Sequence, residues 1–466
     1  MYKTTRGVRL LLQDPERSLL KIAIPTIVAN AIQTLYNFVD AIWVSGLKQA
    51  AFGLAGIGLT QPFAFALIAL SNGIGIGTNS LISRSIGAKD KRGADLAGEH
   101  GIVFSMIVSF SIAIPLVILA PWIFKTMGAG KSQPYAVAYS RIIFGGAPVL
   151  FLSVILTAIL RAEGDTKRAM YAMAGGSILN MVLDPIFIYL LHLGVMGAAI
   201  ATVISRFIAT MPVIYWIFMK KDTFISLNLK IFKFKTRIIK EIAKVGLPAS
   251  LSQLSMSLGI LFFNSLILNI AGPQGVTVYI TGNRIKSLAI LPALGISAAL
   301  ISIVGAWWGA GRKDMVRRAI IHAWKTGVKM EFFIALIVFI FAPTLTAIFI
   351  NDPSMEALRI DIITYLRISS ISFIFIPIGM FTSSSFNGMG KGINALILTF
   401  LRVLIVSFPS AIFYAKTLKL GLQGVWIGIV TGSITAAITG ISWLYIAGIL
   451  RRETNERYDH KGSPKE

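Results

Sequence analysis

Long apolar stretches follow one another along almost the whole chain, and they constrain the fold more than any other feature. A bilayer core about 30 Å thick is crossed by a helix of about 20 apolar residues. Twelve stretches of that length occur in this sequence. Of the 466 residues, 55% are hydrophobic and 14% are charged, whereas about 25% of an average soluble domain is charged. The sequence therefore predicts an all-α integral membrane protein with twelve transmembrane helices.

The twelve stretches form two sets of six, joined by a polar and basic segment. We expect a first lobe over residues 1–219 and a second lobe over residues 246–450. Residues 220–245 are expected to form a cytoplasmic linker, in which residues 236–245 have the pattern of an amphipathic helix on the membrane surface. Residues 451–466 are expected to form a cytoplasmic tail. The expected spans are 17–44, 50–83, 93–122, 134–160, 168–191, 195–219, 246–270, 276–308, 318–350, 356–386, 393–415 and 423–449.

The formal net charge of +24 would suggest nucleic-acid binding in a soluble protein. Here the basic residues fall on alternate loops. With the N-terminus inside, the inside segments hold roughly thirty Lys and Arg residues and the outside loops about five, as the positive-inside rule requires. We therefore expect a multi-pass protein of the cell membrane with both termini in the cytoplasm. We expect a monomer that contacts membrane lipids and a small-molecule substrate, and no nucleic-acid partner.

The chain resembles itself at a spacing of about 225 residues, which indicates an internal structural repeat. Residues 193–204, LGVMGAAIATVI, align with residues 420–431, LGLQGVWIGIVT. Each half holds six spans, an even number, so both halves have the same orientation and are related by a pseudo-two-fold axis along the membrane normal. Substrate is then expected to bind between the halves. Four glycines also align between the halves, Gly73 with Gly295 and Gly87 with Gly309.

Two acids lie well inside the predicted spans and need an explanation, because an ionised carboxylate in hydrocarbon is costly. Asp40 lies toward the outer end of the first span, and Asp184 lies in the second half of the fifth. A carboxylate pair in a partly desolvated cavity can hold a proton, or can hold Na⁺ with help from neutral oxygens such as those of Asn180 and Thr202. Other polar or soft side chains recur on the same helix stripes: Gln33, Tyr36 and Asn37 in the first span, and Met173 and Ser177 in the fifth. Hydrogen bonding between helices would account equally well for the Asn, Ser and Tyr side chains.

Other unusual residues within the spans have simpler explanations. Pro25 frees a backbone carbonyl in the first span and favours bending there, either as a hinge or as a static kink. Glu331 and Asp361 lie near the ends of the ninth and tenth spans, and we expect them at the membrane interface. Long basic side chains can reach the interface or pair with carbonyl groups, so most bases within the spans are expected to be structural. These bases are Arg206, Arg284, Lys286 and Arg402.

Motifs of several other protein classes are absent from the sequence. It contains no G-x-x-x-x-G-K-[ST] phosphate loop, so ATP is not expected to drive this protein. Gly73, Gly75 and Gly77 lie in an apolar run and predict close helix packing rather than a nucleotide loop. There is no cysteine, and the four histidines form no zinc-binding pair on one helix turn. We expect no cofactor and no enzymatic activity.

Five segments carry a resemblance to a known family: QTLYNFVDAIWVSG at 33–46, GAKDKRGAD at 87–95, LRAEGD at 160–165, LNMVLDPIFIY at 179–189 and GLQGVWIGIV at 421–430. They resemble the multidrug and toxic compound extrusion (MATE) antiporters, most closely the archaeal members of the DinF-like branch, and the resemblance covers the chain to about residue 451. It implies two six-helix lobes in a V-shaped arrangement, with alternating access. It also implies export of drug-like, often cationic or amphipathic compounds in exchange for H⁺ or Na⁺.

The resemblance also implies roles for single residues. Asp40, Asn180, Asp184 and Thr202 would form the cation site of the first lobe, and Pro25 would be the point at which the first helix bends. The seventh span, LSQLSMSLGILFF at 251–263, lacks the acids that other branches use for a cation site in the second lobe. Coupling is therefore expected in the first lobe alone. Tyr139, Gln33 and Asn37 would lie near the cation site, and Tyr36, Met173 and Ser177 would line a substrate chamber, together with Thr157 at a position where similar members have asparagine.

Two other functions stay open on the sequence alone. A flippase for lipids or lipid-linked precursors belongs to a related superfamily, although such proteins usually have fourteen spans. A membrane-embedded transferase could use the two aspartates with Mg²⁺, although no D-D-x-x-D motif is present.

Overall fold

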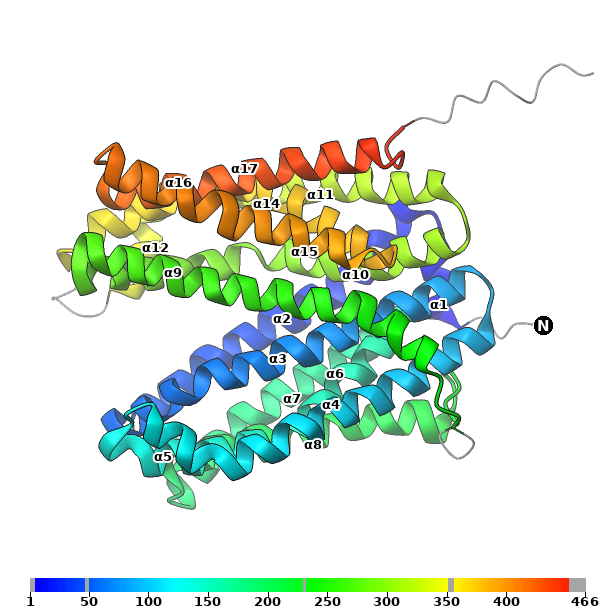
Figure 1. Cartoon of the computed structure of the whole chain (residues 1–466), viewed down its shortest axis with the longest axis horizontal. Coiled ribbons are helices and arrows are strands. Elements are labelled where there is room, and N and C mark those ends of the chain that lie inside the picture. The colour runs from blue at the N-terminus through cyan, green and yellow to red at the C-terminus, as the bar shows by residue number, and fades with distance from the viewer. Residues whose placement is uncertain (1–4, 47–49, 229–231, 351–355, 452–466) are drawn as a thin grey trace, which may run out of the picture.

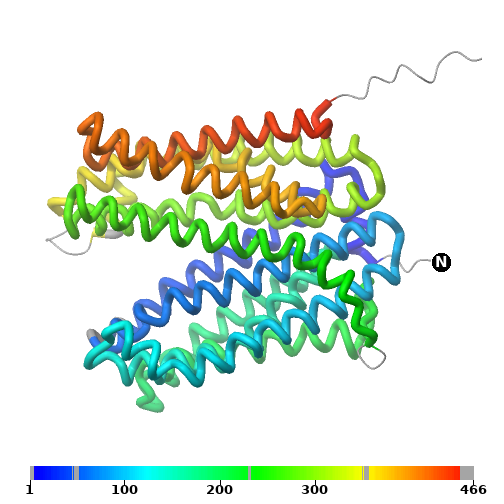
Figure 2. Tube along the Cα trace, in the orientation of Figure 1, coloured from blue at the N-terminus to red at the C-terminus, as the bar shows by residue number. Residues whose placement is uncertain are grey.

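The helices form two bundles, one from each half of the chain (Figure 1). The computed structural model describes residues 5–46, 50–228, 232–350 and 356–451, and every regular element in these ranges is a helix. The two bundles lie against each other at the end where the chain begins and diverge toward the opposite end (Figures 1 and 2). We call the end at which the bundles meet the linker end, because the segment that joins them also lies there.

The first lobe contains the helices expected for its six spans. The π-helical turns η2 (Ile186–Leu190) and η3 (Tyr215–Lys220) extend α7 and α8, and the 3₁₀ turn η1 (Gly130–Ser132) precedes α5. The helices are α1 (Arg6–Leu11), α2 (Pro15–Ser45), α3 (Ala50–Gly87), α4 (Lys91–Thr126), α5 (Gln133–Gly145), α6 (Ala147–Ala162), α7 (Thr166–Pro185) and α8 (Gly194–Ile214).

The second lobe repeats this arrangement with more interruptions. Its helices are α9 (Thr236–Ala289), α10 (Leu291–Gly309), α11 (Lys313–Ile340), α12 (Ala342–Phe349), α14 (Arg359–Gly388), α15 (Gly392–Phe400), α16 (Phe408–Ile412) and α17 (Gly421–Ile446). The π-helical segment η5 (Leu401–Ser407) joins α15 to α16, and η6 (Phe413–Thr417) extends α16, so that together they form one long path.

The number of spans agrees with the sequence. In the described ranges, 10 helices are long and apolar enough to cross a membrane, or up to 12 if each of two bent pairs is one span. The pairs are α5 with α6, bent by 40°, and α11 with α12, bent by 75°. Within α9, Gly272 has φ 64° and ψ −163°, a conformation that is essentially restricted to glycine. The 54 residues of α9 are therefore two helices, the seventh span and the first part of the eighth.

The linker does not contain the separate surface helix predicted for residues 236–245. Thr236 begins α9, which continues through these residues into the seventh span. On the apolar side of the segment, Ile242 and Val245 are fully buried and Ile238 and Ile239 are half-buried, and α9 packs against α3 of the first lobe. The amphipathic pattern was correct, but its apolar face contacts protein instead of lipid, so the second lobe begins at Thr236.

Acidic side chains of the first lobe hold the linker in place. Glu163 Oε2 accepts hydrogen bonds from the backbone N–H groups of Phe224 (2.8 Å) and Ile225 (3.1 Å). Asp95 accepts in the same way from Ser226 (2.8 Å). Glu99, which follows Asp95 by one turn of α4, accepts from Asn228 at 2.9 Å. These bonds supply partners that a segment without regular secondary structure would otherwise lack.

Glycines bring the two lobes into close contact near the linker end. A Cβ atom added at Gly73 would lie 1.9 Å from Ser250 Oγ, and one added at Gly77 would lie 2.3 Å from the carbonyl oxygen of Ile242. Both partners belong to α9 of the other lobe. Gly75 faces its own lobe, where its nearest neighbour is Val154. The predicted role of these glycines in close helix packing is confirmed for this interface.

The aligned glycines Gly87 and Gly309 make matching contacts across the interface. A Cβ at Gly87 would lie 1.7 Å from the carbonyl oxygen of Ala306, and one at Gly309 would lie 2.0 Å from that of Arg84. Each lobe thus places a glycine of its second span against the backbone of the other. Arg84 also forms an ion pair with Glu241 of α9 at 3.7 Å. Such paired contacts are expected from two repeats related by a two-fold axis.

Adding one methyl group at the interface tests this contact. We expect Gly77→Ala to lower the unfolding temperature, because overpacking of this kind typically costs about 1 to 3 kcal/mol. The matched control is Gly58→Ala in the same helix, where an added Cβ would meet nothing within 4 Å. There the gain in helix propensity should leave stability equal or slightly higher. Tryptophan fluorescence during heating measures both variants, and equal stability of the two would contradict the close contact.

The buried Glu163 predicts a dependence of stability on pH. Burial raises its pKa from the ordinary value of 4.5 to about 8, which the hydrogen bonds from the linker and the charge of Arg168 oppose only in part. Between these values the unfolded chain loses a proton that the folded chain keeps, so stability should fall as pH rises from about 4.5 to about 8. We expect Glu163→Gln to flatten the fall in unfolding temperature between pH 5 and pH 8. Glu356→Gln, at an exposed site, should leave it unchanged.

Candidate functional site

The structure brings the two intramembrane aspartates together. Asp40 on α2 and Asp184 on α7 belong to helices that pack against each other, and the charge of Asp40 acts on Asp184 at close range. Asp184 is completely buried. Both oxygens of Asp184 and the Oδ1 atom of Asp40 are buried without a hydrogen-bond partner in the described part of the chain. Carboxylate oxygens in this state strongly favour a bound cation or a proton.

Two neutral oxygen-bearing side chains extend from the carboxylate pair: Asn180 lies beside it, and Thr202 lies next to Asn180. Asn180 lies one helical turn before Asp184, and its Nδ2 atom donates to Thr202 Oγ1 at 3.5 Å. The hydroxyl of Thr202 donates in turn to the carbonyl oxygen of Ala198 at 2.9 Å. The Oδ1 atom of Asn180 is buried and has no partner among the described residues. The amide oxygen therefore remains available to a ligand.

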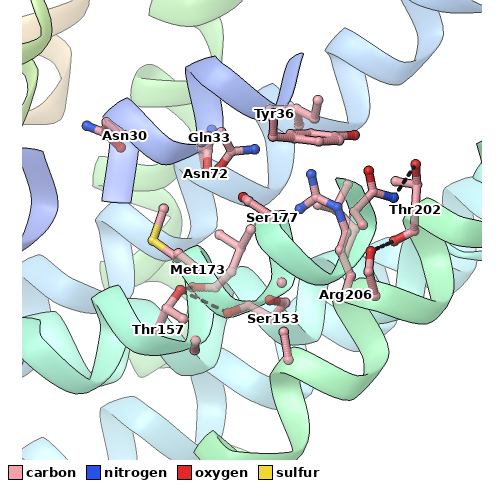
Figure 3. Close-up of a pocket in the computed structure, with 18 of the residues that line it drawn as sticks. Asn30, Gln33, Tyr36, Asn72, Ser153, Thr157, Met173, Ser177, Thr202 and Arg206 are labelled. Atoms are coloured by element: carbon pink, nitrogen blue, oxygen red, sulfur yellow. Dashed lines mark hydrogen bonds between the residues drawn. The ribbon is translucent and has the colours of Figure 1, made fainter. Parts of the chain in front are cut away.

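Two tyrosines complete the surroundings of the acids. Tyr139 on α5 lies close enough to Asp40, Tyr36 and Asp184 to be affected by each of them. Tyr36 on α2 lies near Asp40, and its ring points across toward Thr202 (Figure 3). Both tyrosines are therefore near the acid pair, where the sequence interpretation had placed Tyr139 alone.

Next to the acid pair lies a chamber of about 430 Å³. Its walls come from α2, α3, α6, α7 and α8, and from α10 of the second lobe. Asp40 and Asp184 are not among its lining residues, whereas Asn180 and Thr202 are. Asn180 contacts Asp184 and Thr202 is bonded to Asn180, so these two residues connect the chamber to the acids. Every residue predicted for the chamber lines it: Tyr36, Thr157, Met173 and Ser177. Gln33 lines the chamber too, whereas Asn37 is exposed and does not.

Thr157 and Met173 lie on facing helices in the lower part of the chamber (Figure 3). The hydroxyl of Thr157 lies within hydrogen-bond range of two carbonyl oxygens of its own helix, Ser153 at 2.9 Å and Val154 at 3.0 Å. Its single proton is therefore used within the helix, and toward the chamber it can only accept. Met173 Sδ accepts from Arg161 Nη1 at 3.6 Å.

Two arginines in the chamber were missed or undervalued by the sequence interpretation. Arg161 lies just beyond the expected span 134–160 and Arg206 was expected to be structural, but both line the chamber. For Arg206 a signal was present, because it follows Thr202 by four residues and so lies on the same face of α8. For Arg161 there was none, because α6 runs further than its apolar stretch suggests and ends at Ala162.

Pro25 is buried within α2. The helix runs from Pro15 to Ser45 without interruption. Its proposed action as a hinge stays a prediction.

The second lobe also differs from expectation at one acid. Glu331 on α11 was expected at the membrane interface, but it is completely buried, and neither carboxylate oxygen has a hydrogen-bond partner in the described ranges. Asp361 is exposed, as expected. Phe263, the last residue of the acid-free segment 251–263 in the seventh span, is buried at 5% exposure. The second lobe therefore lacks an acid at that position but holds a buried acid elsewhere.

Each of the two lobes contains one match to the same known family. The MatE family matches residues 25–186 and again residues 248–413. The chain belongs to the MatE family. The repeat found in the sequence is thus the repeat of MatE transporters, and the halves of this member correspond to its two matched segments.

Known MatE proteins are similar along most of the chain. The probable multidrug resistance protein NorM of Thermotoga maritima is 27% identical over 425 residues, which cover 90% of this chain and 89% of that protein. The multidrug export protein MepA of Staphylococcus aureus is 25% identical over 430 residues, covering 90% and 91%. An outward-facing structure of a multidrug resistance MATE family transporter is 40% identical, with a TM-score of 0.92, covering 96% of this chain and 99% of the other. These relatives are transporters and not enzymes, which agrees with the expectation from the sequence.

The unpartnered oxygens of the acid pair predict an unusual response to mutation. We expect Asp40→Asn and Asp184→Asn each to raise the unfolding temperature in a buffer without Na⁺. The new amide can donate to the remaining carboxylate, and a hydrogen bond of this kind contributes about 1 kcal/mol or more. Asp361→Asn, at an exposed acid, serves as control and should change little. A fall in the unfolding temperature of both variants would show that the carboxylates already have stabilising partners.

Proposed function

We propose that this protein is a secondary active antiporter that exports drug-like, often cationic or amphipathic compounds in exchange for H⁺ or Na⁺. The observation that supports the proposal best is the close pair of the half-buried Asp40 and the completely buried Asp184, beside a chamber of about 430 Å³. Such a pair is costly in a membrane, and it lies where a bound cation can influence a bound substrate. The names of the relatives NorM and MepA, a multidrug resistance protein and a multidrug export protein, agree with this role.

The coupling ion would be held by side chains of α2, α7 and α8. A proton would be shared between the carboxylates of Asp40 and Asp184. Na⁺ would take oxygen ligands from the same carboxylates, from Asn180 Oδ1 and from the hydroxyl of Thr202, since Na⁺ prefers oxygen ligands, as the other hard cations do. No resident cofactor is required in either case.

Competition between cation and substrate follows from the residues that they share. Asn180 and Thr202 line the chamber and also adjoin the acid pair. A cation that binds their oxygens removes hydrogen-bonding groups from the chamber. A substrate that contacts them removes the same oxygens from the cation. Two ligands that stabilise different arrangements of the same groups shift the equilibrium between conformations in opposite directions. This is the requirement for antiport by alternating access.

The charges around the chamber favour amphipathic substrates of either sign. Arg161 and Arg206 line it directly and attract an anionic group. Asp40 and Asp184 lie just beyond Asn180 and Thr202, and they attract a cationic group.

The orientation in the membrane is part of the proposal. The basic loops assign the linker end to the cytoplasm. With that assignment both termini are cytoplasmic, and the lobes are closed on the cytoplasmic side, which is an outward-facing arrangement. Similarity to an outward-facing MATE family structure, with a TM-score of 0.92, supports this assignment. Pro25 would then lie in the part of α2 near the closed side, where bending could reach the acid pair. Assignment to an archaeal DinF-like branch, and a monomeric state, remain proposals as well.

The other two functions have less support. A flippase for lipid-linked precursors is not favoured, because the NorM and MepA relatives are named as multidrug proteins. A transferase that uses Mg²⁺ is not supported either, because the relatives are transporters and, among the described residues, no group of three or more acids or histidines could hold a metal ion.

Transport by reconstituted protein tests the proposal. Vesicles loaded with the fluorescent cation ethidium would receive either a pH gradient or a Na⁺ gradient, imposed separately. We expect wild-type protein to export ethidium under at least one of them, and the effective gradient identifies the coupling ion. Asp40→Asn and Asp184→Asn should each abolish this efflux, because a neutral amide cannot exchange a cation.

The control for this measurement is Asp361→Asn, which removes an exposed acid from α14 and should transport normally. All variants must first show a cooperative unfolding transition in the same vesicles. Gradient-driven efflux at the wild-type rate in either Asp40→Asn or Asp184→Asn would overturn the assignment of the coupling site.

A further inference from the structure

The second lobe holds a cavity that the proposed coupling does not use. Its volume is about 520 Å³, within the range of about 300 to 1,000 Å³ that is typical of small-molecule sites. The walls come from α9, α10, α14, α15 with η5, and α17. Leu294 of α10 lines both this cavity and the first-lobe chamber. The two spaces therefore adjoin at α10, and we call the second one the second-lobe cavity.

Two basic side chains, Lys286 and Arg402, line the second-lobe cavity. They are close enough for their charges to repel each other. None of the described residues that line the cavity is an acid. Within the described ranges, neither base has an ion pair or a side-chain hydrogen bond. Two like charges that share a membrane-embedded cavity without a counter-charge are costly, and a bound anion would remove that cost.

The depth of these bases argues against the structural role that the sequence suggested. Arg402 lies ten residues after Gly392 and fifteen before Thr417 on its path through the membrane, which corresponds to about 15 Å and 22 Å at 1.5 Å per residue. Lys286 lies similarly far from both ends of its span at residues 273–309. A side chain that reaches the interface by snorkelling normally starts near a helix end. Arg284 is different, because it is exposed on the outside of α9.

The rest of the cavity wall suits the body of an amphiphile. Phe263 and Ile376, at 5% and 8% exposure, form part of an apolar wall. Asn283 adds a polar group, and its Oδ1 atom already accepts from the hydroxyl of Tyr365 at 3.0 Å. Both N–H donors of the Asn283 side-chain amide remain available to the cavity. Donors and positive charges lie together, and most of the remaining surface is apolar: Met256, Ile260, Met380, Leu398, Val403 and Ile429.

We propose that the second-lobe cavity binds an amphiphilic anion. Its phosphate, sulfonate or carboxylate group would lie between Lys286 and Arg402, and its apolar part would pack against the wall that includes Phe263 and Ile376. Arginine can bind such a group through two parallel hydrogen bonds, while lysine supplies a point charge. This site does not rest on the proposed coupling by Asp40 and Asp184, and it can exist whether or not that coupling is correct.

Equilibrium binding of a fluorescent fatty acid, 11-(dansylamino)undecanoic acid, tests the proposal on full-length protein in uncharged maltoside micelles. We expect wild-type protein to bind this anion and to bind its neutral amide much more weakly. Lys286→Gln and Arg402→Gln should each weaken binding of the anion by about ten- to a hundredfold, the range for a lost hydrogen bond to a charged group. Binding of the neutral amide should not change.

Arg284→Gln is the matched control, because it removes a cation from the same helix without touching the cavity. It should bind the fatty acid as the wild type does. Lys286→Arg, which keeps the charge, should retain most of the binding. Wild-type affinity in both glutamine variants, or an equal loss in Arg284→Gln, would overturn the proposal.

A measurement on unaltered protein covers the case in which the glutamine variants fail to fold. Decanoate should displace the bound fluorescent fatty acid, and decyltrimethylammonium of equal chain length should not. Equal displacement by the cation would overturn the proposal. Asp40→Asn should bind the fatty acid normally even if it has lost gradient-driven efflux, and this separates the present site from the coupling site.

The source of the anion is distinguished in nanodiscs. If the membrane supplies it, discs that contain phosphatidylglycerol should weaken binding of the fatty acid relative to discs of pure phosphatidylcholine. If the anion comes from water, both discs should give the same affinity. In either disc, the fatty acid should bind wild-type protein more tightly than Arg402→Gln, and equal binding to both proteins would overturn the proposal.

Discussion

The close approach of the two lobes near the linker end is the constraint on which the rest of the structure depends. Lipid is as apolar as a leucine side chain, so helices in a membrane gain little hydrophobic energy by associating and must be held by packing and hydrogen bonds. Gly73, Gly77 and Gly87 allow this packing from the first lobe, and Gly309 allows it from the second. Because the lobes contact each other so closely there, the chamber and the second-lobe cavity lie on either side of α10, whose Leu294 borders both.

The lobes share a fold, but they do not share a pattern of charge. The first lobe pairs the half-buried Asp40 with the completely buried Asp184, while the second places the half-buried Lys286 and Arg402 in a cavity and buries Glu331 elsewhere. Pseudo-symmetry requires small residues at the shared interface and an apolar surface toward lipid, and both halves satisfy these requirements. The interior polar groups are not constrained by either requirement, so they can differ between the repeats. A two-fold backbone can therefore carry a one-sided coupling site.

The features that the sequence predicted correctly are those whose free-energy cost depends only on the residue and its own helix. A carboxylate within a span is expensive wherever the rest of the fold lies, so Asp40 and Asp184 could be recognised in advance, as could the spans themselves. The features that were missed depend on contacts between distant segments. Glu163 binds a linker more than sixty residues away, and Glu331 lies inside the lobe because of how α11 packs. The amphipathic pattern at residues 236–245 identified the apolar face of the helix correctly. It could not show whether that face contacts α3 or lipid, since both are apolar.

Because both lobes contribute residues to the chamber wall, motion of the lobes could release a substrate. Most of the lining residues belong to the first lobe, but Leu291 and Leu294 come from α10 of the second. They follow the break at Ile290 between α9 and α10. If the lobes rotate about their glycine contacts, these two leucines leave the wall, and the chamber loses apolar surface without any change in its polar groups. Substrate affinity can therefore change through lobe position alone, and under the proposed coupling a cation at the acid pair would determine which position is stable.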